Sequence, residues 1–201
     1  AFEAVWMDRI SAANPAMKVT DTQRGIPLRD IESAGSGKPP ATGSGLKDPH
    51  VWTHPLLVKI MAGHIRDALV ETDPSHREHY EQNYVAFAAD LDRLDQWIRA
   101  LFQGVRSRRF MVFHPSWGYF ADAYGLTQIP VESAGKEPGP RTLADLIDWG
   151  RKEQVRVIFV QQQFSRRAAE TVAQAIGATV VAVDPLAENY LDNLRDVARA
   201  F

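Results

Sequence analysis

The chain has 201 residues, of which 45% are hydrophobic and 24% charged, a composition typical of one or two compact domains. The net charge is −2, and basic residues are scattered apart from RSRR at 106–109, which argues against binding to nucleic acid or an anionic membrane. The lack of cysteine excludes disulfides, thiolate catalysis and cysteine-ligated metal sites within this chain. No apolar run approaches the ~20 residues that span a bilayer, so we expect no membrane-spanning segment.

The N-terminal third combines short elements with one long polar stretch. Residues 3–13 predict an amphipathic helix that ends at Asn-Pro, and MKVTD at 17–21 predicts a short strand. Residues 33–47 are rich in Gly, Ser and Pro and predict a flexible loop. Pro55 then opens a predicted helix that continues to about Val70. Its expected buried residues are Leu56, Leu57, Ile60, Met61, Ile65 and Leu69.

A second helix of unusual length follows DPS at 73–75, where Asp73 suits the N-cap and Pro74 the first helical position. Gly104 is its expected stop, so the helix would be roughly 45 Å long. The apolar pattern covers only about three heptads, and this favours a helix that connects two lobes over a coiled coil. Its apolar positions alternate gaps of four and three residues: Tyr80, Tyr84, Phe87, Leu91, Leu94, Ile98 and Leu101.

From residue 105 onward, β-branched strands alternate with amphipathic helices, which predicts a parallel sheet covered on both faces. The expected strands are 110–114, 127–132, 155–161 and 179–184, and the expected helices are 117–125, 141–153, 165–176 and 186–200. The predicted fold class is therefore α/β, with two lobes of parallel sheet joined by a long rigid helix. The predicted organisation is a partial N-terminal lobe at 1–73, the connecting helix at 74–104 and a C-terminal lobe at 105–201.

Two of these strands end on a side chain that can bind a metal. FMVFH ends at His114 before Pro115, and TVVAVD ends at Asp184 before Pro185. Ligands of open parallel sheets bind beyond the carboxyl ends of the strands, and an imidazole with a carboxylate suits a divalent first-row metal. The alternative stays open that Asp184 caps the next helix and that His114 is only a rim residue.

A third candidate ligand, His50 in DPHVWTHP, precedes the long helix and would reach a cleft from the opposite lobe. His54 stands at the expected N-cap of the next helix, so capping or solvent exposure is favoured over metal binding. The remaining histidines are expected to be surface or packing residues: His64, His76 and His79. No Ser–His–Asp spacing, phosphate-binding glycine loop or HExxH motif indicates an enzyme.

An ordered set of motifs gives a more specific indication than any single residue. Five motifs follow one another along the chain: DPHVW with Pro55, the helix opened by DPS, FHPSWGYFADAYGL at 113–126, EPGP at 137–140, and the segment from QQQFS to AVDPLAENY at 161–190. This succession resembles the zinc- and manganese-binding proteins of ABC transporters, the cluster A-I or zinc-uptake-type solute-binding proteins. The resemblance covers nearly the whole chain.

This resemblance implies two α/β lobes joined by a rigid helix, with one divalent ion held in the cleft between them. By matching position it implies that His50, His114 and Asp184 are metal ligands, and a histidine at 114 favours Zn(II), with Mn(II) as the alternative. It also implies a periplasmic or otherwise extracytoplasmic monomer that delivers the ion to an ABC permease in the membrane.

The chain departs from the family pattern at several positions. The first histidine of the family lies early in the N-terminal lobe, whereas no histidine precedes His50 here. We therefore expect part of that lobe to be missing, and a weak or water-completed site with three protein ligands. The loop before DPH carries no His or acidic ligands, Gln161 stands where relatives often have Glu, and His54 where they often have Asp.

Two other classes of function remain open from the sequence. A three-ligand zinc with an open coordination position would suit a hydrolase, for which Glu132 and Glu188 are the nearest general-base candidates. A metal-independent adhesive or binding protein of the same fold is the second alternative.

Overall fold

Four parallel strands form the sheet on which the C-terminal half is built. The computed structural model describes residues 4–32, 46–132, 138–161 and 166–201. The strands lie in the order β2-β1-β3-β4, and every neighbouring pair is parallel, as predicted. β3 is buried along its whole length, which agrees with its continuous apolar sequence. The strand bounds are β1 (Arg109–Val112), β2 (Thr127–Pro130), β3 (Val157–Gln161) and β4 (Thr179–Val183).

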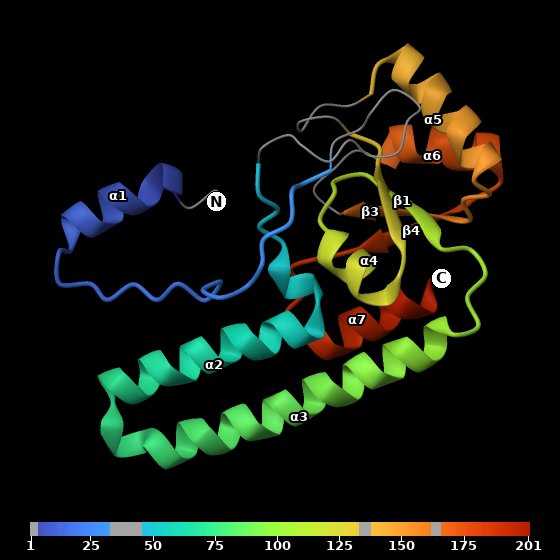
Figure 1. Ribbon diagram of the computed structural model, residues 1–201. Helices are drawn as coiled ribbons and strands as arrows, with labels where there is room; N and C mark the ends of the chain where they lie inside the picture. The colour runs from blue at the N-terminus through green and yellow to red at the C-terminus, as the bar shows by residue number, and fades with distance from the viewer. Residues whose placement is uncertain (1–3, 33–45, 133–137, 162–165) are drawn as a thin grey trace.

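Helices cover both faces of this sheet (Figure 1). Successive side chains of a strand point to opposite faces, so Phe110 and Val112 belong to one core cluster and Met111 to the other. The first cluster is closed by the long helix α3 (Arg77–Phe102) together with α4 and α7, and the second by α5 and α6. The covering helices are α4 (Gly118–Tyr124), α5 (Pro140–Lys152), α6 (Arg166–Ile176) and α7 (Tyr190–Arg199).

The predicted long helix is α3 (Arg77–Phe102), whose 26 residues correspond to roughly 39 Å. A short 3-10 turn, Pro74–His76, precedes it, and the Asp73 carboxylate accepts hydrogen bonds from Ser75 Oγ at 2.6 Å and Tyr80 OH at 2.9 Å. The C-terminal half of α3 is buried under the sheet, while its N-terminal half extends away from the sheet beside α2 (Pro55–Thr72) (Figure 1).

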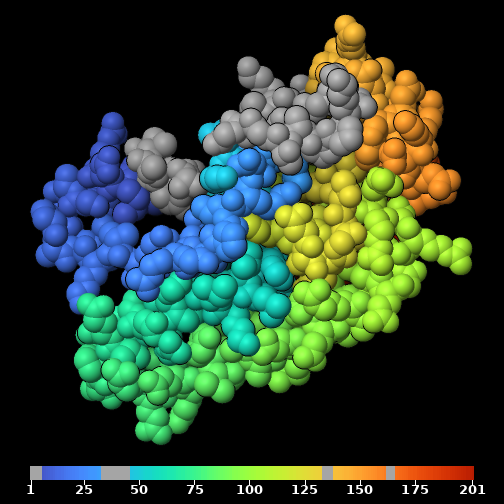
Figure 2. Space-filling view, viewed as in Figure 1, coloured from blue at the N-terminus to red at the C-terminus, as the bar shows by residue number. Residues whose placement is uncertain are grey.

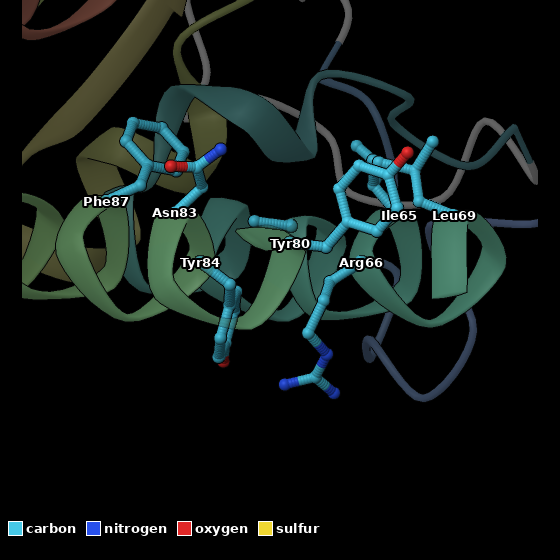
Figure 3. A pocket seen from close by; sticks show the side chains of 8 residues that line it. Ile65, Arg66, Leu69, Tyr80, Asn83, Tyr84 and Phe87 are labelled. Carbon is cyan, nitrogen blue, oxygen red and sulfur yellow. The ribbon is translucent and has the colours of Figure 1, made fainter. Parts of the chain in front are cut away.

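The apolar face of α2 is only partly covered, which corrects the predicted buried set. Leu57 and Met61 pack against a small cluster with Ile26, Val51 and Tyr119. In contrast, Ile60, Ile65 and Leu69 are 40%, 48% and 42% exposed. Ile65 and Leu69 lie with Tyr80 along an apolar hollow of about 270 Å³ between α2 and α3 (Figure 3). The spacing of the apolar residues predicts which face of α2 is apolar, but no described element covers the part of that face that carries Ile65 and Leu69.

The N-terminal segment differs from the prediction in one element. The helix α1 (Ala4–Ala13) forms as expected, but MKVTD at 17–21 is irregular and not a strand. The described part of residues 1–73 contains no strand for it to pair with, and its isolated bridge joins Asp30 to Lys47. Residues 33–45 of the predicted loop lie outside the described residues. Among the described helices, none is both long and apolar enough to cross a membrane.

A matched pair of substitutions on α3 tests how its two sides contribute to stability. Leu94 is 1% exposed within the core and Leu101 is 37% exposed. Leu94→Ala leaves a cavity and should lower the free energy of unfolding by about 2–5 kcal/mol. Leu101→Ala should cost about 1 kcal/mol or less. Urea unfolding followed by circular dichroism measures both, and equal losses would contradict this placement of α3.

Candidate metal site

Two of the three predicted ligands lie side by side. His50 immediately precedes the 3-10 turn η1 (Val51–Thr53), and His114 follows β1. Their ring centroids are 5.2 Å apart, with the planes at 77°. His50 precedes α3 in the sequence and His114 follows it, so the two imidazoles bring distant parts of the chain into contact.

The ring of His50 is oriented by a carboxylate two residues earlier. Asp48 is fully buried, and its Oδ1 accepts hydrogen bonds from the backbone N–H of His50 at 3.0 Å and from His50 Nδ1 at 2.7 Å. An ionised carboxylate only accepts, so Nδ1 carries the proton and Nε2 the lone pair. This is the tautomer in which Nε2 binds a metal.

His114 has the same kind of partner from another strand. Its Nδ1 donates to Oε1 of Glu132 at 2.6 Å, and Glu132 is 3% exposed. Gln161 holds the backbone of His114, because its Oε1 accepts the His114 N–H at 3.2 Å and its Nε2 donates to the His114 carbonyl at 2.7 Å. Each imidazole is thus directed by a buried carboxylate through Nδ1, as is common among metal-binding histidines.

Asp184 does not join this pair directly. One of its carboxylate oxygens accepts the N–H of Leu186 at 2.9 Å, so it stabilises the turn after β4. It does not cap α7, whose N-cap residue is Asn189. β3 separates β1 from β4, which places their ends roughly 10 Å apart. Across the described ranges, no group of three or more His, Asp or Glu side chains is close enough to hold a metal ion.

Trp52 connects the His50 turn to the segment that carries Asp184. Its Nε1 donates to the carbonyl of Pro185 at 2.8 Å, and its ring centroid lies 5.4 Å from that of His50. The residue after Asp184 is therefore fixed against η1, although the Asp184 carboxylate is not in the histidine pair.

The remaining histidines are separate from this pair. His64 Nε2 lies 2.9 Å from the carbonyl of Arg24, and His76 and His79 are exposed, as expected of surface or packing residues. His54 occupies the N-cap position of α2 but makes no side-chain capping bond, which corrects that part of the prediction. Its ring is half-buried against Tyr124 at 6.2 Å between centroids.

The roles of both carboxylates differ from what the sequence predicts. Asp48 stands in the same DPH motif as His50, and that spacing of two residues is a usable local signal because an Asp side chain commonly bonds to the backbone two residues later. Glu132 was expected only as a general-base candidate, whereas it orients His114. Its link to His114 spans 18 residues and follows from the pairing of β1 with β2.

Comparisons with known proteins identify the family of the chain. The family described as zinc-uptake complex component A, periplasmic (ZnuA) matches residues 1–201. The chain belongs to this zinc-uptake family. A crystal structure of ZnuA has a TM-score of 0.89 and 40% sequence identity over 98% of this chain and 74% of that chain. A zinc-bound ZnuA with residues 138–173 deleted has a TM-score of 0.88 at 40% identity, over 98% of this chain and 73% of that one.

A curated relative covers a smaller part of the chain. The high-affinity zinc uptake system protein ZnuA of Bacillus subtilis is 33% identical over 141 residues, which is 69% of this chain. This chain spans 44% of the length of that relative.

The environment of His54 predicts a pH-dependent stability. Burial lowers the pKa of His54, Arg99 acts in the same direction, and Asp95 and Asp122 oppose it. The unfolded chain therefore takes up this proton first, at about pH 6.5. The stability of the folded protein should fall as the pH drops from about 6.5 through the lowered pKa of His54, and should be unaffected by this group at higher pH.

Urea unfolding of wild type, His54→Gln and His79→Gln between about pH 8 and pH 5 measures this effect. His54→Gln should flatten the loss of stability at low pH, whereas His79→Gln changes an exposed ring and should keep the wild-type slope. Identical slopes in all three proteins would show that His54 does not titrate as described.

Proposed function

We propose that this chain is part of an extracytoplasmic solute-binding protein that captures Zn(II) and delivers it to an ABC transporter permease. The observation that carries the proposal is the pair of His50 and His114, each with Nδ1 on a buried carboxylate and their rings 5.2 Å apart. Membership of the zinc-uptake family supports it, as does the likeness to a zinc-bound ZnuA.

We assign the ion to Nε2 of His50, Nε2 of His114 and the carboxylate of Asp184. Two imidazoles and one carboxylate suit the four-coordinate geometry of zinc, and a water molecule would take the fourth position. Mn(II) prefers harder oxygen donors and should bind more weakly. Because a carboxylate oxygen of Asp184 accepts the N–H of Leu186, metal binding requires this side chain to leave that bond and turn toward the histidines, while Trp52 keeps Pro185 against η1.

This ligand set also gives a division of the chain into parts. We assign residues 1–73 to an N-terminal lobe, 74–104 to the connecting helix and 105–201 to a C-terminal lobe. The ion would then be held at the boundary of the lobes, with His50 from the first and the other two ligands from the second. A continuous α3 limits hinge motion, so release would proceed by movement of ligand side chains such as that of Asp184.

Isothermal titration with Zn(II) tests the ligand set. Loss of a group that only orients a metal ligand weakens binding by about 10–100-fold. Single Ala variants of His50, His114 and Asp184 remove a ligand itself, so each should weaken binding by at least this much. His79→Ala, which alters an exposed ring on α3, serves as the matched control and should bind like wild type. Zinc should also raise the melting temperature of wild type, because a ligand of the folded state stabilises it by mass action.

An unchanged affinity in the variant with all three substitutions would contradict the assignment. Tighter binding of Mn(II) than of Zn(II) to the wild-type protein would contradict the choice of metal.

A further inference from the structure

The side chain of Arg29 joins three carboxylates from separate parts of the chain. Its Nη2 donates to Glu32 at 2.6 Å, its Nε to Asp122 at 2.8 Å and its Nη1 to Oδ2 of Asp48 at 3.3 Å. Burial alone would lower the pKa of Arg29, but the hydrogen bond to Glu32 and the three negative charges outweigh it and raise the pKa. The guanidinium is therefore a fixed positive charge, with 16% of its side chain exposed.

Backbone contacts fix Asp48 against the same residue. The N–H of Asp48 donates to the carbonyl of Arg29 at 2.9 Å. The hydroxyl of Tyr119 accepts the N–H of Arg29 at 3.2 Å and donates to the carbonyl of Asp48 at 3.0 Å. Arg29 and Asp48 are thus held together through main chain and side chain. Figure 2 shows the segment around Arg29, in blue, lying against the yellow surface of residues 115–130.

The space for the guanidinium exists because residue 118 is glycine. A Cβ at Gly118 would lie 1.5 Å from Nη1 of Arg29 and 2.9 Å from Oδ2 of Asp48. Any side chain at the start of α4 would therefore displace the contact between Arg29 and Asp48.

Asp48 divides its two oxygens between Arg29 and His50. Oδ2 faces the guanidinium, while Oδ1 accepts both N–H groups of His50. A fully buried carboxylate is costly without a compensating charge, and among the described contacts of this carboxylate Arg29 is the cationic one that faces Oδ2. The position of the His50 acceptor thus depends on Arg29.

We propose that Arg29 is a positioning residue for metal binding at His50, and that it acts through the carboxylate of Asp48. This inference rests on the proposed function. Arg29 holds Oδ2 of Asp48, so that Oδ1 stays aligned with His50 Nδ1 and Nε2 keeps the lone pair directed toward the metal. In this way a residue from the 26–32 segment sets the geometry of a ligand that it does not touch.

Zinc affinity, measured by competition with a fluorescent zinc chelator, gives the first test. Arg29→Gln should weaken binding by about 10-fold, the lower end of the range for partners that bond to a ligand directly, because Arg29 acts one contact further out. Asp122→Asn removes a different contact of Arg29, with a carboxylate that is 61% exposed, and should stay within about fivefold of wild type. Gly118→Ala places a Cβ against both Nη1 of Arg29 and Oδ2 of Asp48 without changing any charge, and should weaken binding at least as much as Arg29→Gln.

A double-mutant cycle separates action through Asp48 from a general structural effect. In the Asp48→Asn background, Arg29→Gln should cause little further loss of zinc affinity, because the intermediate group is already changed. An equal loss in the wild-type and Asp48→Asn backgrounds would overturn the proposal.

The imidazole nitrogen NMR shifts of metal-free protein give a readout that does not depend on zinc. His50, assigned with a His50→Gln variant, should have a protonated Nδ1 in wild type and a mixture of tautomers in Arg29→Gln. If Arg29→Gln does not fold, Arg29→Lys keeps the charge but not the forked contacts and should show the same mixture. If the His50 tautomer is the same in wild type and in the Arg29 variants, the role of Arg29 is refuted. If the tautomer changes as expected but wild type does not bind zinc, the proposed function alone is refuted.

Discussion

The buried carboxylate of Asp48 is the contact on which the rest of the site depends. It accepts two hydrogen bonds from His50 through one oxygen and faces Arg29 through the other. A charge in this position is tolerated only where donors and a counter-charge surround it. The same contacts tie Arg29 and Asp48 to α4, since Tyr119 hydrogen-bonds to the backbone of both and Gly118 leaves room for the guanidinium. The contacts that orient the ring of His50 are therefore the same contacts that attach the segment around Arg29 to α4.

The ring of His114 is also oriented by a buried carboxylate, but this carboxylate comes from the sheet. Its carboxylate partner Glu132 follows β2, so parallel pairing of β1 with β2 brings the two together. His50 depends on a loop stabilised by ion pairs, whereas His114 depends on the sheet and its core. The two imidazoles thus present the same tautomer from two different kinds of support.

The sequence allowed the parallel sheet, its covering helices and α3 to be predicted, because each follows from local apolar periodicity. The strand expected at 17–21 was wrong, since a strand requires a neighbour and the described part of residues 1–73 has none for it. Ile65 and Leu69 are exposed although the sequence predicts their burial. Apolar residues at helical spacing identify the apolar face of a helix, but they do not show whether another element covers it. The proximity of His50 and His114 follows from the predicted cleft between two lobes, and the resemblance implies the same pair. The roles of Glu132 and Arg29 depend on contacts between distant residues that no local pattern encodes.

The side chain of Gln161 acts as a substitute for a peptide group. The backbone ladder between β1 and β3 cannot continue in the usual way past His114, because Pro115 has no N–H to donate. Gln161 exchanges both an N–H and a C=O with His114, so its amide supplies what the next backbone pair would have supplied. A carboxylate at 161 would accept from the His114 N–H but leave the His114 carbonyl without this donor. Glutamine and glutamate, almost identical in shape, therefore hold His114 differently: the amide bonds to both of its backbone groups, whereas beside a glutamate the Ser116 N–H would remain the donor to its carbonyl.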